Sequence, residues 1–355
     1  MIHSAEEACA ANEASRRGAS VAEARTNIAL VKYWGKRPGA GNLPAVGSLS
    51  LTLHELATRT EVRVDEALRE DAFFLGGERI AGEPARRVTE FLDLVRAQAG
   101  RTSRAEVRSR NSFPTAAGLA SSASGFAALA LAAAHAFGLA LDPRRLSQLA
   151  RRGSGSAARS IFGGFVLLHR GTRDDGDDCY AEPRLDPAAA ASGWDVRMVI
   201  AIAGEQSKST LATSGMNHTA ATSPYFRAWV ESQPADLVAA REAILRRDLA
   251  AVGEIAERSC LTMHASALAA RPGVLYWTGA TVDGFHAVRQ LRAAGVGAWF
   301  TNDAGPHVKA ICAAEDATRV AEALASVRGV NRTIVCSPGA AARVLERDTT
   351  TQGGA

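Results

Sequence analysis

The sequence contains few cysteines, and their arrangement argues against two kinds of protein. Only five of the 355 residues are cysteine, and no two of them have CxxC spacing. Five scattered thiols indicate neither a disulfide framework nor a zinc site. They favour a reducing, cytoplasmic location.

The sequence also lacks a long apolar run and a basic tract. Residues 1–20 contain acidic residues early and no apolar core, so they do not resemble a signal peptide. The alanine-rich run after Gly125 is interrupted at His135 and is too short for a membrane span. The formal net charge is only +4, and no basic run is interleaved with aromatic residues. We therefore expect no membrane association and no nucleic-acid partner.

The length and the order of elements predict the fold class. A chain of 355 residues is too long for one small core, which predicts two packed domains or one large α/β unit. Strand-like and helix-like segments mix without a regular βαβ rhythm, which favours an α+β fold. We predict an N-terminal arm (1–20), an N-terminal domain (21–187), a C-terminal domain (188–345) and a tail (346–355).

Several elements can be predicted from periodicity and capping. Residues 49–65 alternate as strands joined by a turn, and apolar residues from Val88 to Val95 recur with helical spacing after Pro84. Asp142 and Pro143 predict the start of a helix. Aspartates in "TRDDGDD" predict a turn, with a metal loop as the alternative, although EF-hand spacing is absent. Towards the C-terminus we predict helices in 224–269, 281–294 and 315–327, and strands at 296–302, 307–312 and 332–337.

The stretch "SFPTAAGLASSASGFAALALAAA", from Ser112 to Ala134, places a glycine-containing turn before an apolar helix. The first amides of a helix have no intrahelical partners, and the helix dipole adds positive charge there, so such a turn can bind phosphate. The Walker pattern is absent, which argues against a P-loop. A phosphate site and a small-residue helix start packed against a sheet both remain open from these residues alone.

Three further segments concentrate polar groups. "NIALVKYWGKR" places two lysines beside tyrosine and tryptophan, and "RRGSGSAARSIFGGF" places small hydroxyl residues before Arg159. The guanidinium of Arg159 can bind a carboxylate or phosphate in a bidentate manner. In "FTNDAGPHV", Asp303 follows a strand and precedes a turn, where an ordinary turn aspartate is the alternative.

Together these segments resemble the diphosphomevalonate decarboxylase family within the GHMP small-molecule kinases. The resemblance rests on "NIALVKYWGK", "PTAAGLASSASGFAAL", "GSGSAARSIFGGF" and "DAGPHVK", in that order from about residue 24 to residue 340. It implies an N-terminal ribosomal-protein-S5-like domain that carries the nucleotide, a C-terminal ferredoxin-like domain and an active site in the cleft between them. It also implies ATP with Mg²⁺, usually a homodimer, and phosphorylation of a 3-hydroxyl followed by loss of phosphate and CO2.

The resemblance further implies roles for individual residues. Asp303 would orient or partly deprotonate the hydroxyl, Lys32 would pair with Asp303, and Arg159 would hold the substrate carboxylate. Substrate contacts are implied for Asn27, Tyr33, Lys36, Ser154, Gly155, Ser156, Thr213 and Met216. ATP contacts are implied for Pro114, Ala117, Gly118, Leu119, Ala120, Ser121, Ser122 and Ser124, with Ser121 also a ligand of Mg²⁺.

Two departures from the family pattern affect substrate recognition. Ala212 and Thr213 stand where the family has serine followed by arginine or another polar residue, and Val46 and Gly47 replace a polar pair. The first hypothesis is decarboxylation of mevalonate 5-diphosphate to isopentenyl diphosphate, and the second is the same chemistry on mevalonate 5-phosphate or another 3-hydroxy acid. A kinase without decarboxylation is disfavoured because the catalytic set is intact. A scaffold protein would predict a lost aspartate or a broken phosphate loop.

Overall fold

The structure, a computed structural model, describes residues 18–39, 41–113, 121–185, 194–204 and 211–345. The predictions for most of the N-terminal arm, for the tail and for the domain boundary at 187/188 lie outside these residues. So do those for five predicted ATP contacts: Pro114, Ala117, Gly118, Leu119 and Ala120.

The first of two sheets is built around two long, paired strands. Its strand order is β12-β1-β2-β5-β3-β4, and β6 joins β2 to β7. β1 begins at Ala19, so the last two residues of the predicted arm lie in a strand. The strands are β1 (Ala19–Val31), β2 (Ser48–Asp65), β3 (Ala72–Leu75), β4 (Glu78–Arg79), β5 (Arg104–Asn111), β6 (Phe165–Leu168), β7 (Ala181–Leu185) and β12 (Arg343–Leu345).

The predicted turn within residues 49–65 is wrong, because β2 is one continuous strand of 18 residues. Its first part pairs with β6 and its last part with β5, so the strand changes partner along its length. Opposite the change, Arg25 pairs with Ala57 and Asn27 with Thr52, which marks a bulge of extra residues in β2. A bulge bends a strand and interrupts its alternation without ending it.

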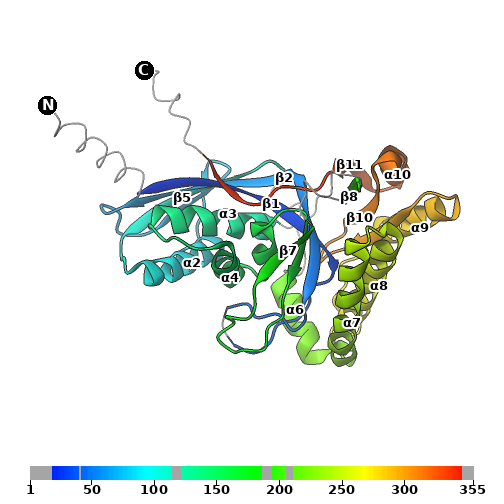
Figure 1. The fold of residues 1–355 in the computed structure, drawn as a ribbon, viewed down its shortest axis with the longest axis horizontal. Coiled ribbons are helices and arrows are strands. Elements are labelled where there is room, and N and C mark those ends of the chain that lie inside the picture. The colour runs from blue at the N-terminus through cyan, green and yellow to red at the C-terminus, as the bar shows by residue number, and fades with distance from the viewer. Residues whose placement is uncertain (1–17, 40, 114–120, 186–193, 205–210, 346–355) are drawn as a thin grey trace, which may run out of the picture.

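Helices α2 (Glu83–Ala99), α3 (Ser121–Ala136) and α4 (Pro143–Gly153) lie on one face of the first sheet (Figure 1). α3 is apolar nearly all round and lies against β1 and β2, with alanines buried along most of its length. The predicted cap of α4 is confirmed, since the Asp142 carboxylate accepts the backbone N–H of Arg145. A 3-10 helix, Gly155–Ile161, follows α4.

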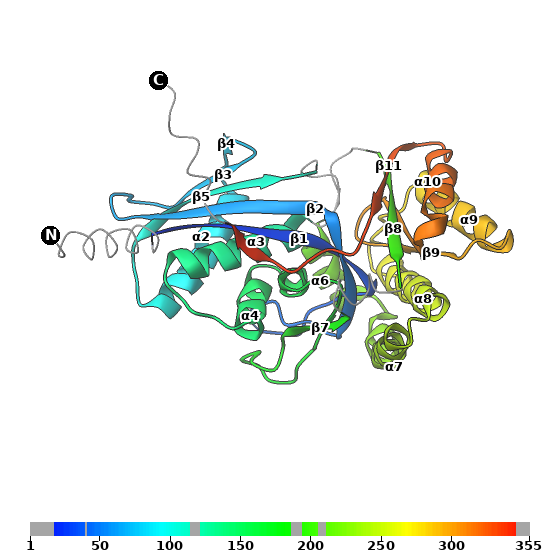
Figure 2. The same ribbon diagram turned by 45° about the horizontal axis from the view of Figure 1, so that its top comes forward.

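The second sheet has the order β11-β8-β10-β9 and is antiparallel. Its strands are β8 (Val196–Ala203), β9 (Ala298–Asn302), β10 (Val308–Ala313) and β11 (Val330–Cys336). Helices α9 (Gly279–Ala293) and α10 (Ala317–Ala325) pack against it, and the paired helices α7 (Phe226–Leu245) and α8 (Leu249–Leu268) lie between the two sheets (Figure 2). A short helix, α6 (Ala212–Thr222), precedes them.

One apolar core joins the two halves of the molecule. Leu30 of β1 and Leu49 of β2 belong to the same buried cluster as Ile200 of β8, Ala243 of α7 and Trp299 of β9. The chain then returns to the first sheet, because β12 pairs with β1. This continuous packing holds residues from both halves in fixed positions beside each other. The predicted α+β class is confirmed, and no helix within the described residues is long and apolar enough to cross a membrane.

Candidate active site

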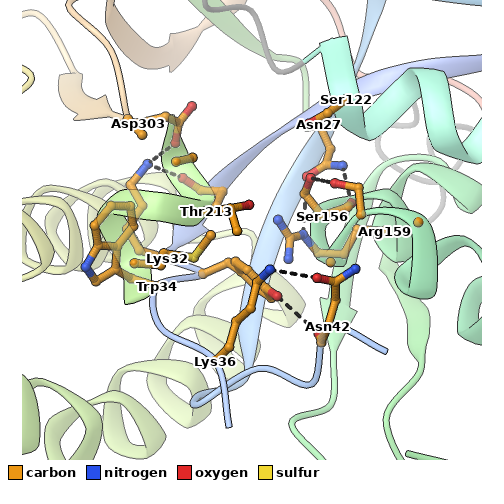
Figure 3. A pocket seen from close by; sticks show the side chains of 18 of the residues that line it. Asn27, Lys32, Trp34, Lys36, Asn42, Ser122, Ser156, Arg159, Thr213 and Asp303 are labelled. Carbon is orange, nitrogen blue, oxygen red and sulfur yellow. Dashed lines mark hydrogen bonds and ion pairs between the residues drawn. The ribbon is translucent and has the colours of Figure 1, made fainter. Parts of the chain in front are cut away.

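One cavity collects the residues that the sequence predicts for catalysis and substrate binding. It encloses about 180 Å³ and lies where the end of β1, the 3-10 helix, α6 and the turn after β9 meet (Figure 3). All eleven of these predicted residues line it: Asn27, Lys32, Tyr33, Lys36, Ser154, Gly155, Ser156, Arg159, Thr213, Met216 and Asp303.

Asp303 lies between two buried lysines. Its Oδ1 accepts a hydrogen bond from Lys32 Nζ at 2.7 Å, and its Oδ2 lies 3.0 Å from Lys309 Nζ. Both lysine side chains are 1% exposed, whereas the Asp303 side chain is 26% exposed to the cleft. Burial raises the pKa of Asp303, but the two ammonium groups outweigh it and hold that pKa well below its usual range. The carboxylate is therefore ionised at neutral pH and open to a ligand from one side.

Asn302 fixes the turn that presents Asp303. Its buried amide Nδ2 donates to the carbonyls of Gly305 at 3.0 Å and His307 at 2.8 Å, while Oδ1 accepts from Trp277 Nε1. Asn302 thus ties the turn 303–307 to itself. No sequence pattern predicts this role, because both bonds from Nδ2 end on backbone atoms.

His264 lies behind this turn and is not a candidate acid or base. It is 1% exposed and packs on the ring of Trp277, with centroids 4.9 Å apart. Burial and, to a smaller extent, the nearby Lys32 ammonium lower the pKa of His264 to about 3. The imidazole is therefore neutral at physiological pH. Asp303 is the ionised group that faces the cavity from this side.

Arg159 is a buried cation without an anionic partner among the described residues. Its Nε donates to Ser50 Oγ at 3.0 Å and Asn27 Oδ1 at 3.2 Å, and its Nη1 donates to Ser48 Oγ at 2.5 Å. Burial lowers the pKa of Arg159 to about 10, so the group keeps its charge at neutral pH. Asn27 is itself held by Ser160 Oγ at 2.8 Å. A buried guanidinium that neutral groups orient is suited to an anionic ligand.

Tyr33 and Lys36 line the opposite side of the cavity. The Tyr33 hydroxyl donates to the backbone carbonyl of Asn42 at 3.2 Å, and burial raises the pKa of Tyr33, so the hydroxyl remains protonated. A Cβ at Gly155 would clash with that hydroxyl, which explains the glycine at this position. Lys36 Nζ donates to Asn42 Oδ1 at 2.7 Å. These groups form a polar wall with one free positive charge.

The two departures from the family pattern have different structural consequences. Ala212 and Thr213, in the first turn of α6, line the cavity, so this departure reaches the ligand site. Val46 is 2% exposed in a cluster with Trp34 and Met216, beneath the cavity and not in its lining. A Cβ at Gly47 would lie 2.6 Å from Leu237 Cδ2 of α7. Val46 and Gly47 pack the layer below the cavity, so this departure can act on the ligand only through the residues that line the cavity above them.

A second, mostly apolar cavity of about 200 Å³ lies between the first sheet and helices α2 and α3. Ser122 and Arg87 line both cavities, so the two sites adjoin at the start of α3. The second cavity is also lined by Ser121, Gly125, Phe73, Val107 and Leu129. Its shape, with hydroxyls at one end and apolar side chains beyond, suits a phosphate chain attached to a flat ring system.

Ser124 behaves differently from its neighbours. It is fully buried, shares a hydrogen bond of 2.7 Å with Thr58 Oγ1 and lines neither cavity. Its side chain is on the face of α3 that packs against β2. The structure therefore gives Ser124 a packing contact where the sequence predicted an ATP contact.

The described residues fit a magnesium ion only if a ligand brings most of its coordination. No cluster of three or more His, Cys, Asp or Glu side chains that could hold a metal occurs in the described parts of the chain. Mg²⁺ commonly takes most of its ligands from water and phosphate oxygens and only one or two from protein. The partly exposed Ser121 hydroxyl at the edge of the second cavity fits that pattern.

Sequence reasoning missed several residues around the site. Lys309 lies in the recognised "DAGPHVK" segment, yet its contact with Asp303 arises only because β9 and β10 form a hairpin. No sequence pattern singles out Arg87, which lines both cavities, or Asn42, which lines the first. The helical spacing around Val88 was the one signal that places Arg87 beside the second cavity.

Comparisons with known proteins agree with this geometry. Residues 24–181 match the diphosphomevalonate decarboxylase-like N-terminal domain, and residues 198–347 match the mevalonate 5-diphosphate decarboxylase C-terminal domain. Diphosphomevalonate decarboxylase of Aspergillus fumigatus is 35% identical over 328 residues, covering 87% of this chain and 80% of that protein. Phosphomevalonate decarboxylase of Haloferax volcanii is also 35% identical over 328 residues, and the match covers 92% of this chain and 98% of that protein.

Solved structures show the same similarity. The structure of MDDEF in complex with MVAPP, AMPPCP and magnesium has a TM-score of 0.87 and 39% identity, and the match covers 93% of this chain and 99% of that one. The two domain matches together span most of the sequence, and their order is that of the predicted motifs. The chain belongs to the diphosphomevalonate decarboxylase family, within the GHMP kinase superfamily.

Proposed function

We propose that this protein is an ATP-dependent decarboxylase of mevalonate 5-diphosphate that forms isopentenyl diphosphate. The observation that carries the proposal is one cavity in which the Lys32–Asp303 pair, at 2.7 Å, faces a buried guanidinium without an anionic partner among the described residues. The hydroxy acid offers a hydroxyl to the first group and a carboxylate to the second. The hydroxyl thus meets a hydrogen-bond acceptor, and the carboxylate meets a cation.

In the first half of the reaction, the substrate's 3-hydroxyl oxygen attacks the γ-phosphorus of ATP, and the bond to the β-phosphate breaks to release ADP. The Asp303 carboxylate accepts a hydrogen bond from that hydroxyl and orients it. Because the pKa of Asp303 is held low, the carboxylate is a weak base, so the proton leaves late in the transfer. Such timing suits the loose transition state of phosphoryl transfer, in which positioning and electrostatics dominate.

In the second half, the C3–O bond to phosphate breaks and the C1–C2 bond releases CO2, its electron pair becoming the C2=C3 double bond. Arg159 holds the carboxylate so that the breaking C1–C2 bond lies in line with the departing phosphate. Asn27, Ser48 and Ser50 fix the guanidinium through neutral hydrogen bonds and leave its charge for the substrate. Lys36 and Tyr33 bind the phosphorylated end.

The nucleotide occupies the second cavity in this proposal. The phosphates lie along Ser121 and Ser122, which places the γ-phosphate at the junction with the first cavity, and the base packs among Phe73, Val107 and Leu129. Mg²⁺, with the Ser121 hydroxyl as its protein ligand, supplies positive charge that neutralises phosphate oxygens. A cytoplasmic homodimer is part of the same proposal, and light scattering of the purified chain tests the dimer.

The test is product stoichiometry. Purified protein with Mg-ATP and mevalonate 5-diphosphate is expected to release ADP, phosphate and CO2 in equal amounts. ADP without CO2 would instead identify a kinase. Absence of all three products with every 3-hydroxy acid offered would refute the proposed chemistry.

A second candidate substrate is mevalonate 5-phosphate, which one observation favours. Thr213 lines the cavity where a family arginine would add a cation, and an arginine–phosphate bond is worth about 1.5–3 kcal/mol, or one to two decades in affinity. The similar Haloferax volcanii protein is a phosphomevalonate decarboxylase. The ratio of kcat/KM for the two mevalonate phosphates decides between them.

A further inference from the structure

Residues of the loop between β1 and β2 line the active-site cavity, and Asn42 is one of them. The loop is closed by a backbone hydrogen bond from Arg37 to Leu43 at 2.9 Å and by an isolated bridge between Lys36 and Pro44. Asn42 has φ of +56°, a conformation that asparagine tolerates better than most residues. Its side chain lines the cavity beside Lys36.

The contacts of Asn42 determine which way its amide faces. Nδ2 donates to the backbone carbonyl of Arg152 at 2.8 Å and to that of Arg151 at 3.2 Å, both at the end of α4. Only an NH₂ group can face two carbonyl oxygens, so Oδ1 must point the other way. There Oδ1 accepts a hydrogen bond from Lys36 Nζ at 2.7 Å (Figure 3).

A neutral acceptor at this position has a distinct electrostatic effect. A carboxylate would also orient the ammonium of Lys36, but it would neutralise the charge that an anionic ligand needs. No carboxylate of the described residues lies within ion-pair distance of Lys36, which lies half-buried near Arg87. The amide oxygen therefore fixes the direction of the ammonium and leaves its charge intact.

We propose that Asn42 is a positioning residue that aims the Lys36 ammonium at the phosphorylated end of the substrate without neutralising it. The inference rests on the proposed function for the identity of that substrate. The competing explanation is a purely structural one, in which Asn42 only anchors the loop to α4. Arg151 already supports such an anchor, because its guanidinium donates to the backbone carbonyl of Gly41.

A double-mutant experiment separates the two explanations. Asn42→Gly keeps the positive φ and removes the amide. Asn42→Asp keeps the side-chain shape but places a carboxylate next to the two backbone carbonyls and the Lys36 ammonium. Asn42→Gly is expected to raise the KM for the mevalonate phosphate about tenfold, with kcat and the KM for ATP within about twofold. Asn42→Asp is expected to raise it further. In a Lys36→Met background, Asn42→Gly should change that KM by less than about twofold.

The matched control is Arg247→Gly. Arg247 has the same φ of +56° and is exposed between α7 and α8, so this change adds a glycine at an equivalent backbone conformation. It corrects for glycine's effect on the unfolded chain and should leave every KM unchanged. An equal effect of Asn42→Gly with and without Lys36, or no effect at all, would overturn the proposal.

Binding of inorganic diphosphate distinguishes failure of this inference from failure of the proposed function. The wild-type protein is expected to bind diphosphate by calorimetry, with about tenfold weaker binding in Asn42→Gly. If neither mevalonate phosphate is turned over but this difference persists, the proposed function fails and the role of Asn42 stands. If turnover occurs and both KM and diphosphate binding are unchanged in Asn42→Gly, the role of Asn42 fails alone.

Discussion

Replacing Lys309 by methionine tests the charge arrangement at the centre of the site. The change removes the cation that lies 3.0 Å from the buried Oδ2 of Asp303. Removing one member of a buried ion pair costs about 3–5 kcal/mol. Because 26% of the Asp303 side chain is exposed to the cleft, we expect a loss of unfolding free energy at the lower end of this range, about 3 kcal/mol. Methionine has a similar volume, so little of the loss should come from a cavity.

The assay is urea unfolding of four proteins: wild type, Lys309→Met, Asp303→Asn and the double variant. Asp303→Asn leaves the buried Lys32 and Lys309 ammonium groups without their shared carboxylate, so each single change should be costly. The double variant has neither a lone carboxylate nor two ammonium groups facing each other. Its loss of unfolding free energy should therefore be smaller than the sum of the two single losses by at least about 1 kcal/mol. Lys36→Met is the matched control and should cost about 1.5 kcal/mol, the lower end for a hydrogen bond with one charged partner, since its acceptor is neutral. Losses that add within about 0.5 kcal/mol would refute the reasoning.

The same variant should change the pH dependence of turnover. A depressed pKa of Asp303 means that its ionised form stabilises the fold above about pH 4, the usual aspartate pKa, and that this contribution is lost as the pH falls below it. The wild-type kcat/KM should therefore show no acid limb from Asp303 between pH 5 and 8. Lys309→Met removes one of the two ammonium groups that lower this pKa, so the acid limb should move to higher pH. An unchanged profile would contradict this.

Three other changes probe separate parts of the two cavities. Arg159→Lys should lower kcat/KM at least 100-fold in the coupled ADP and CO2 assay, because an ammonium cannot replace a guanidinium fork held by Ser48 and Ser50. A kcat/KM within tenfold of wild type would count against the role of Arg159. Thr213→Arg should improve the preference for mevalonate 5-diphosphate over the 5-phosphate by about one to two decades, and an unchanged ratio would remove residue 213 from the phosphate site. Gly125→Leu should fill the second cavity, where a Cβ meets nothing within 4 Å, and raise the KM for ATP alone, with Gly125→Ala as control.

Local signals in the sequence predicted the helices better than the first sheet. The cap at Asp142 and the spacing from Val88 to Val95 are properties of neighbouring residues, and the structure has helices there. The continuity of β2 depends on its exchange of partners from β6 to β5, which no property of residues 49–65 reveals. The pairing of β12 with β1 joins residues more than 300 positions apart and was missed for the same reason.

The site shows the same division. The resemblance identified eleven residues that the structure places around one cavity, nine of them within the quoted motifs, but their roles remain a proposal. Lys309 was missed because a lysine on a strand of mixed residues carries no sign of burial, and only the hairpin of β9 and β10 turns it towards Asp303. An apolar residue next to a site, such as Val46, can line the pocket or support it from below, and only packing distinguishes these cases.

In the proposed function, chemistry and substrate recognition are attached to different parts of this fold. Lys32 and Asp303 follow the ends of β1 and β9, which are anchored in the core shared by both sheets, so substitutions near them disturb buried charge. Thr213 is in the first turn of α6, where a change of side chain alters the charge facing the ligand without moving a core residue. The phosphorylation state of the substrate can therefore change while the decarboxylation machinery stays intact. Variants at 213 should alter KM ratios between substrates, whereas variants at 309 should lower kcat for every substrate equally.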